Sequence, residues 1–308
     1  MRWPPPGITA DMVGVMDELS KKPDFVESGL ASVVTEVAFA LAVHLDDSWH
    51  ASGTAVSVGG GLLMTAKHVV EDYWERLGTG GRLRGSLSAN FRIVARQMLG
   101  AGKELAYWRA TRCWTSPATD IAFILVVPLS ESAARYRRWR VPQLQLNPPQ
   151  TGEKVVAFGY HTPEVSVTRD ANRLRVEWDD HPSVSVGEVT EVHPVLRDRH
   201  LLRFPCFQTN SRFDGGMSGG PIFNDQGQVC GLVCATMVGD PQAGHTSYGL
   251  TLWPAMGMLI NIGVDGAVSE TPIRVLEIAK AGVISALGWE SVSLVPIDDG
   301  VEIRYTPP

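Results

Sequence analysis

The chain has 308 residues, 44% hydrophobic and 19% charged, which is ordinary for a soluble globular protein with room for two modest domains. Its 27 basic and 33 acidic residues give a net charge of −6, so the chain as a whole has no attraction for nucleic acid or acidic lipid. No apolar run reaches the roughly 20 residues of a membrane span, and no signal peptide is visible. We therefore expect a cytoplasmic protein without a membrane partner.

The first element in chain order is a predicted helical extension over residues 1–29. Met12, Val13, Met16 and Leu19 lie on one side of a helix that Thr9 would cap and Pro23 would end. The spacing of its apolar residues is that of a helix, whereas the residues that follow form short β-rich runs. We treat it as a separate N-terminal segment.

From Ala31 onward, short β-rich runs alternate with turn residues in two series, which is typical of an all-β barrel or sandwich. The runs are numerous enough for two β-barrels, over residues 30–140 and 141–264, with Ser130–Pro149 as the linker between them. The first series is Val33–Leu45, Thr54–Val58, Leu62–Thr65, Ser88–Ala95 and Ile121–Val127. The second series is Lys154–Gly159, Arg173–Glu177, Ser183–Val192, Arg203–Gln208, Pro221–Phe223, Val229–Cys234 and Tyr248–Leu252.

The last segment, residues 265–308, is predicted to be an appendix made of a helix and a hairpin. Thr271 and Pro272 are typical of a helix start, and the apolar residues from Leu276 to Leu287 would form one face of that helix. Asp299 and Gly300 separate two β-like runs, which indicates a β-hairpin.

The cysteines indicate a reduced protein. Cys113, Cys206, Cys230 and Cys234 are unevenly spread, and none forms the CxxC pair of a zinc site. We expect all four to be reduced and mostly buried, as in cytosolic chains. The sequence predicts no metal site and no cofactor.

The most informative motif for function is the Gly-x-Ser-Gly-Gly-Pro run at residues 216–221. A serine nucleophile needs an exposed tight turn, and the glycines around Ser218 permit one. Backbone N–H groups of Gly216 and Ser218 would then converge where negative charge develops on an attacked carbonyl, as an oxyanion hole. A glycine-rich hairpin turn is the alternative interpretation, and the full motif disfavours it.

Serine also needs a base and an orienting acid. His68 follows the apolar run Leu62–Thr65, so it is placed just past a strand end. Asp120 directly precedes the apolar run Ile121–Val127, where a half-buried carboxylate needs a partner. We predict that Asp120 accepts a hydrogen bond from one ring nitrogen of His68, the base that activates Ser218.

Thr-Ala-x-His at 65–68, Asp-Ile-Ala at 120–122 and the serine motif occur in this order, and the chain resembles the trypsin/chymotrypsin superfamily over residues 30–264. The resemblance implies two six-stranded antiparallel β-barrels with the His68–Asp120–Ser218 triad in the cleft between them. It also implies an endopeptidase that acts through an acyl-enzyme. Gln208, Thr209 and Asn210 resemble the bacterial high-temperature-requirement branch, here without a PDZ domain. Met217 replaces the aspartate that serves trypsin as a zymogen switch.

Ungapped counting within that family places Arg212 and Phe213 at the base and wall of the primary specificity pocket. Val233, Cys234, Ala235 and Thr236 would line the facing strand. Phe213 favours a small apolar residue before the scissile bond, whereas Arg212 would recruit an acidic one or point to solvent. Without an aspartate at the base, cleavage after Lys or Arg is not expected.

Three other functions share features with this sequence. A catalytically silent, protease-like binding module is disfavoured because the three triad residues and Gly216 are present. A nucleic-acid-binding role for Arg135–Arg140 is disfavoured because that run lies in the predicted linker. An α/β-hydrolase would have the order serine, acid, histidine. We expect limited cleavage of a specific protein, and a regulatory protein partner, in a bacterial stress or defence pathway.

Overall fold

The computed structural model describes residues 25–27, 33–46, 48–78, 82–88, 90–100, 102–136, 139–170, 173–237, 245–298 and 300–308. The predicted N-terminal helix lies outside these residues. No helix among the residues described is long and apolar enough to cross a membrane.

The first barrel closes a ring of six antiparallel strands within the described chain, because β7 pairs with both β6 and β8. In ring order these are β7 (Glu104–Thr115), β6 (Arg92–Leu99), β2 (Ala38–Leu45), β3 (Ser48–Gly59), β4 (Leu62–Ala66) and β8 (Ile121–Pro128). The short β5 (Arg84–Ser86) adds to β7 outside the ring. All five residues of β4 are buried, as expected for a strand covered on both faces.

The second barrel closes in the same way through the pairing of β13 with both β10 and β14. Its ring is β13 (Pro221–Phe223), β10 (Lys154–Asp170), β11 (Arg173–His193), β12 (Cys206–Thr209), β15 (Thr246–Leu250) and β14 (Val229–Met237). The short β1 (Phe25–Glu27) adds to β11. The two rings confirm the prediction of a double β-barrel.

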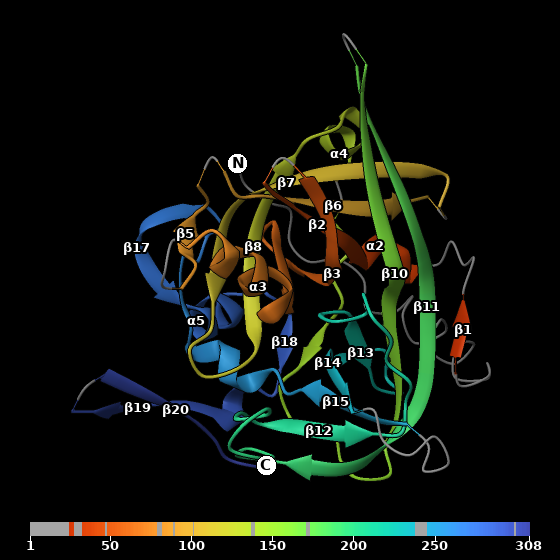
Figure 1. Ribbon diagram of the computed structural model, residues 1–308. Helices are drawn as coiled ribbons and strands as arrows, with labels where there is room; N and C mark the ends of the chain where they lie inside the picture. Colours follow the sequence, from red (N-terminus) through yellow and green to blue (C-terminus); the bar gives the residue numbers. More distant parts are fainter. Residues whose placement is uncertain are drawn as a thin grey trace.

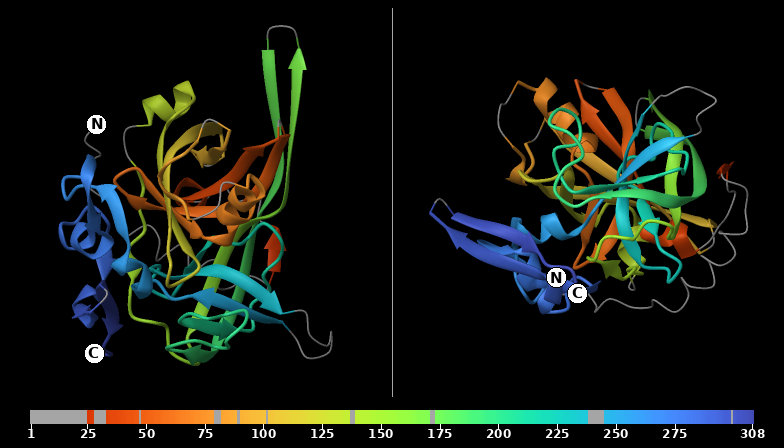
Figure 2. Two further views of the ribbon diagram at one scale, coloured as in Figure 1. Left: turned by 60° about the vertical axis from the view of Figure 1, so that its left-hand side comes forward. Right: turned by 90° about the horizontal axis from the view of Figure 1, so that it is seen from below.

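Strands β10 and β11 are much longer than the sequence pattern indicated. Their antiparallel pairing continues from Lys154 and Glu188 to Asp170 and Arg173, with one irregularity between His161 and Glu164. The outer part of this hairpin projects beyond both barrels as a two-stranded arm (Figures 1 and 2). β10 continues past its predicted end at Gly159 to Asp170, and β11 joins the runs predicted as Arg173–Glu177 and Ser183–Val192 into one strand, because the two strands pair along this whole length.

The segment predicted as a linker is structured. It contains α4 (Glu131–Arg135) and β9 (Leu144–Gln145), and β9 lies parallel to β14. Trp139 is 5% exposed and stacks on Phe39, so part of the basic run belongs to the core. The charges at the ends of that run are paired within the chain, Arg135 with Glu104 and Arg140 with Glu36.

A C-terminal unit follows the second barrel (Figure 2). It consists of η1 (Trp253–Gly257), β16 (Leu259–Ile262), β17 (Val268–Arg274), α5 (Val275–Lys280), β18 (Ala286–Leu287), η2 (Trp289–Ser291) and the hairpin of β19 (Val292–Ile297) with β20 (Gly300–Tyr305). The hairpin confirms the prediction. The predicted helix start is wrong, because Thr271 and Pro272 lie in β17, which pairs with β16, and α5 begins only at Val275.

A second correction concerns Val33–Leu45, predicted as one strand. Its first five residues form α2 (Val33–Val37), and the strand begins at Ala38. The β-branched residues here favour a strand locally. Val34 and Val37 are nevertheless buried in helical spacing against the first barrel, so tertiary packing overrides the local preference.

Candidate active site

His68 and Asp120 are brought together by the pairing of β4 with β8. The register joins Ala66 to Ile121, so the residue after one strand faces the residue before the other. The Lys67 amide donates to the Asp120 carbonyl at 2.9 Å, which closes this end of the ladder. His68 then begins α3 (His68–Arg76).

The Asp120 carboxylate holds both the backbone and the ring of His68. The His68 amide donates to Oδ1 at 3.0 Å, and Nδ1 of the ring lies 2.6 Å from Oδ2. The Asp120 side chain is 9% exposed and the His68 side chain 36%. With Nδ1 occupied by the carboxylate, Nε2 is the ring atom that can accept a proton from another group.

The pKa of His68 is raised above its ordinary value of 6.5. Burial is the largest single influence and lowers the pKa, because it disfavours the charged ring. The hydrogen bond and charge of Asp120, helped by the charge of Asp72, together outweigh it and favour the imidazolium. The site therefore stabilises a positive charge on the ring.

Ser218 lies on the turn between β12 and β13. Gly216 and Gly219 adopt φ values of 89° and 80°, which strain any side chain with a Cβ. The Gly219 amide donates to the Val233 carbonyl at 2.8 Å, and the Gly220 amide donates to the Met217 carbonyl at 2.9 Å. The turn is therefore fixed to β14 and to itself.

Thr54, in β3 of the first barrel, fixes the same turn from the other side. Its amide donates to the Ser218 carbonyl at 2.9 Å, and its hydroxyl donates to the Gly216 carbonyl at 2.9 Å. The hydroxyl also accepts a hydrogen bond from the Tyr160 amide of β10 at 3.0 Å. A fully buried threonine thus connects the turn to both barrels.

The amides of Gly216 and Ser218 are left without an acceptor. Neither donates a hydrogen bond to any group in the described part of the chain. Because Thr54 holds the carbonyls of both Gly216 and Ser218, the turn that carries the two amides is restrained. Two unpaired N–H groups beside a serine can receive an anionic oxygen.

Cys234 connects the two halves of the site. Its thiol lies 3.5 Å from Asp120 Oδ2 and donates to it, and its carbonyl accepts from the Ser218 hydroxyl, also at 3.5 Å. Burial, and then the Asp120 charge, raise the pKa of this thiol well above its ordinary value, so it is a neutral donor. Sequence reasoning assigned Cys234 only to the pocket strand, because nothing in the sequence indicates contact between residues 114 positions apart.

The remaining predicted pocket residues are arranged unevenly. Arg212 makes two hydrogen bonds to Asp214, at 3.0 and 2.6 Å. Phe213 and Val233 lie in the core of the second barrel, 4% and 1% exposed. Ala235 is half-buried and Thr236 exposed, with the Thr236 hydroxyl donating to the Phe213 carbonyl at 2.7 Å. Among the predicted pocket residues, Ala235 and Thr236 are therefore the two that reach the surface without being part of an ion pair.

Met217 is fully buried. A Cβ added to Gly159 would lie 2.6 Å from the Met217 Cα, so the two residues are in close contact. Within the described residues no cluster of three or more His, Cys, Asp or Glu side chains could hold a metal ion. All four cysteines are free and buried.

The model of the trypsin-like peptidase domain matches residues 51–232, which include His68, Asp120 and Ser218. The chain belongs to this family and is a serine-type peptidase. Comparison with curated proteins gave no match.

Several solved structures are similar to this chain. The Rv3671c protease from M. tuberculosis, in its active form, is 16% identical over 71% of this chain and 77% of that chain, with a TM-score of 0.45. Deg5 is 13% identical over 71% of this chain and 84% of its own, with a TM-score of 0.46. The MamO protease domain from Magnetospirillum magneticum is 14% identical over 71% and 93%, with a TM-score of 0.42.

Proposed function

We propose that His68, Asp120 and Ser218 form the catalytic triad of this peptidase. The observation that carries the proposal is the Asp120 carboxylate, which holds the His68 ring at 2.6 Å while Cys234 connects that carboxylate to Ser218. The Ser218 hydroxyl turns from the Cys234 carbonyl toward His68 Nε2 when substrate binds. His68 accepts its proton as the oxygen attacks the scissile carbonyl, and the imidazolium is stabilised by Asp120.

The amides of Gly216 and Ser218 form the oxyanion hole in this proposal. They have no other acceptor in the described chain, so they need no reorganisation when charge develops on the attacked oxygen. His68 then returns the proton to the leaving amine, and an acyl-Ser218 ester remains. Water hydrolyses that ester with His68 again as the base.

A fluorophosphonate probe tests the assignment because it labels only an activated serine. We expect labelling of the wild-type protein, and none of the Ser218→Ala or His68→Ala variants. Ser88→Ala, at an exposed serine, is the control and should label like the wild type. If the folded wild-type protein is not labelled, the catalytically silent binding module becomes the better interpretation.

For cleavage specificity, we propose a small apolar residue before the scissile bond. The Arg212 guanidinium is already bonded to Asp214, which disfavours its binding an acidic substrate side chain. On the pocket strand, the accessible side chains are those of Ala235 and Thr236, which are small and uncharged. A peptide-library cleavage profile should show Ala, Val or Ser before the cleaved bond. A profile dominated by Lys, Arg, Asp or Glu would contradict this preference.

For the biological role, we propose limited cleavage of one protein partner in the bacterial cytosol, in a stress or defence pathway. The four free, buried thiols support a reducing compartment. Comparing new protein N-termini in cells that carry the wild-type or the Ser218→Ala protein would test it. One or a few Ser218-dependent cuts are expected, and dozens of unrelated cuts would contradict it.

A further inference from the structure

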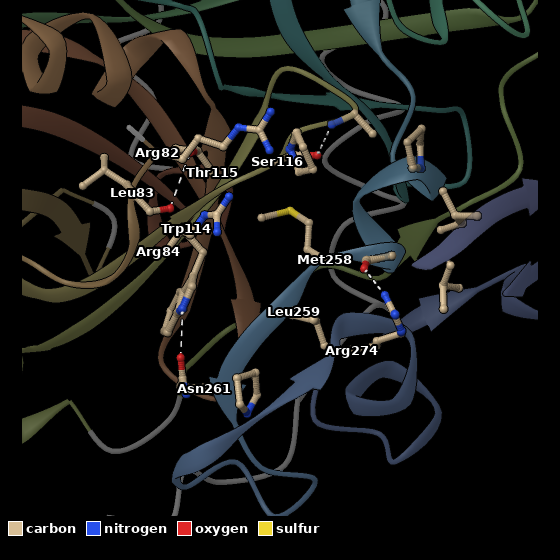
Figure 3. A pocket seen from close by; sticks show the side chains of 17 residues that line it. Arg82, Leu83, Arg84, Trp114, Thr115, Ser116, Met258, Leu259, Asn261 and Arg274 are labelled. Atoms are coloured by element: carbon tan, nitrogen blue, oxygen red, sulfur yellow. Dashed lines mark hydrogen bonds between the residues drawn. The ribbon is translucent and has the colours of Figure 1, made fainter. Parts of the chain in front are cut away.

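A cavity of about 500 Å³ lies away from the proposed triad, between the first barrel and the C-terminal unit (Figure 3). Its first wall is the chain around β5 and the end of β7, from Trp114 to Ala118. Its second wall is η1, β16 and Arg274 of β17, and β20 contributes Val301 and Ile303. None of His68, Asp120 and Ser218 lines it.

Three arginines line the cavity, and none of its described lining residues is acidic. Arg82 and Arg84 are exposed, and their side chains form no ion pair or hydrogen bond within the described chain. Arg274 lies on the opposite wall and donates to the Gly257 carbonyl at 2.8 Å (Figure 3). A cluster of unneutralised arginines is unusual on a chain of net charge −6, and it favours an anionic ligand.

The rest of the cavity is apolar. Trp114 and Met258 are 3% and 6% exposed and form its interior, whereas Leu259 and Val301 are 52% and 38% exposed at its rim. Trp114 Nε1 donates to Asn261 Oδ1 at 3.4 Å, which joins the first barrel to the C-terminal unit behind the apolar surface. A ligand that fits must therefore bring apolar groups as well as negative charge.

We infer that this cavity binds an acidic peptide segment whose carboxylates alternate with apolar side chains. The carboxylates would pair with Arg82, Arg84 and Arg274, and the apolar side chains would cover Leu259 and Val301. A single strand of nucleic acid fits poorly, because Trp114 is too buried to offer its ring for base stacking. The inference rests on the proposed function, because the segment would belong to the protein that the peptidase cleaves.

Binding is measured on the Ser218→Ala protein, so the result does not depend on catalysis. The probe is a fluorescein-labelled eight-residue peptide that alternates leucine with glutamate, followed by fluorescence anisotropy. Two control peptides replace its glutamates with lysine or its leucines with serine. Saturable binding is expected for the first peptide, with at least about tenfold weaker binding of both controls.

Variants locate the binding site. Arg84→Glu should weaken binding about tenfold, and Arg84→Gln should weaken it less, because reversal adds repulsion to the lost attraction. Arg109→Glu, at an exposed arginine outside the cavity, is the matched control and should bind like the parent protein. Leu259→Ser should also weaken binding, whereas Leu201→Ser, at a leucine that is 69% exposed, should not.

Several results would overturn the inference. They are no saturable binding, binding that Arg84→Glu and Leu259→Ser leave unchanged, equal binding of the serine-substituted peptide, and displacement by a ten-residue oligothymidylate at lower concentration than by unlabelled peptide. Any of them would leave the triad proposal intact, since fluorophosphonate labelling tests Ser218 separately. Equal melting temperatures of the variants establish that loss of binding is not loss of fold.

Discussion

At the residue scale, the Asp120 carboxylate accepts three hydrogen bonds, from the His68 amide, the His68 ring and the Cys234 thiol. The thiol donor is the least expected of the three. It adds a weak donor where a buried carboxylate needs every available partner. The orientation of Asp120, and through it of His68, therefore depends on a residue that touches neither Nε2 nor Ser218 Oγ with its side chain.

Replacing Cys234 tests this positioning role. Cys234→Ala removes the donor to Asp120, and we expect kcat to fall about tenfold with little change in KM. Cys234→Ser keeps a hydroxyl donor, and its kcat should stay within about threefold of the wild type. Steady-state kinetics on a peptide substrate measure both. Equal losses in the two variants would indicate that Cys234 serves packing alone.

The raised pKa of His68 predicts the pH dependence of activity. As the proposed base, His68 must be unprotonated, so kcat/KM should rise with pH through an inflection above 6.5, the ordinary pKa of histidine. In Asp120→Asn the carboxylate charge is gone while burial remains, so the inflection should move below that of the wild type. Activity should also fall by about four orders of magnitude. An unchanged inflection in Asp120→Asn would contradict the assignment.

The same shift has a consequence for stability. Because the folded-state pKa of His68 is raised above its unfolded value, the protonated ring contributes stability below the unfolded pKa. This contribution is lost as pH rises through the folded pKa. Activity therefore increases over the pH range in which this one contribution to stability disappears.

At the scale of elements, the turn carrying Ser218 packs against the first barrel at Gly219. A Cβ on Gly219 would lie 2.1 Å from Thr65 Oγ1 and 2.3 Å from the Thr54 carbonyl, and its φ is +80°. Gly215, in the same turn, has nothing within 4 Å of a Cβ. The two glycines therefore form a matched pair.

We expect Gly219→Ala to destabilise the protein by about 3 kcal/mol, since the clash is with backbone as well as side chain, and to reduce activity at least tenfold. Gly215→Ala should change the free energy of unfolding by less than about 1 kcal/mol. Urea denaturation and peptide hydrolysis measure the two effects. Similar stability of the two variants would mean that the turn is not held against β3 and β4 as tightly as the contacts indicate.

Elements differ in how far the sequence predicted them. The β4 and β8 strands are uninterrupted apolar runs, and the positions of His68 and Asp120 at their ends followed from that pattern. The contacts of Thr54 with the Ser218 turn and of Cys234 with Asp120 could not be found in this way, because they join strands far apart in the chain. A contact between strands also explains the wrong helix start at Thr271 and Pro272. Their local sequence favours a helix, but the pairing of β17 with β16 holds them in a strand.

At the scale of the whole molecule, the C-terminal unit is part of the main core. Val275, Leu276, Ile278 and Ile284 are buried in the cluster that also contains the first barrel. The parallel pairing of β18 with β9 attaches the unit to the segment between the barrels. Deleting residues 265–308 would therefore expose core surface, and the arginine and Leu259 substitutions give a cleaner test of its role.

Docking of the two barrels is tested at Thr54. Thr54→Val keeps the shape but removes the hydroxyl, which leaves the Gly216 carbonyl and the Tyr160 amide without their partner. We expect a loss of about 2–4 kcal/mol in the free energy of unfolding and a fall in kcat, because leaving buried polar groups unpaired is costly. Thr54→Ser retains the hydroxyl and should lose less than half as much, as measured by calorimetry. Equal losses would assign the effect to the methyl group.

The dependence of the Ser218 turn on Thr54 affects when, during synthesis, the proposed active site is assembled. His68, Asp120 and Thr54 lie in the half of the chain that leaves the ribosome first, whereas Ser218 and Cys234 are made later. With the triad proposed above, a nascent first barrel carries the base without the nucleophile, and a second barrel that has not docked carries the nucleophile without its base. The reactive arrangement proposed here exists only once both halves have folded against each other. Under this proposal, the chain therefore cannot hydrolyse peptide bonds in neighbouring proteins until its own two barrels have been made and have docked.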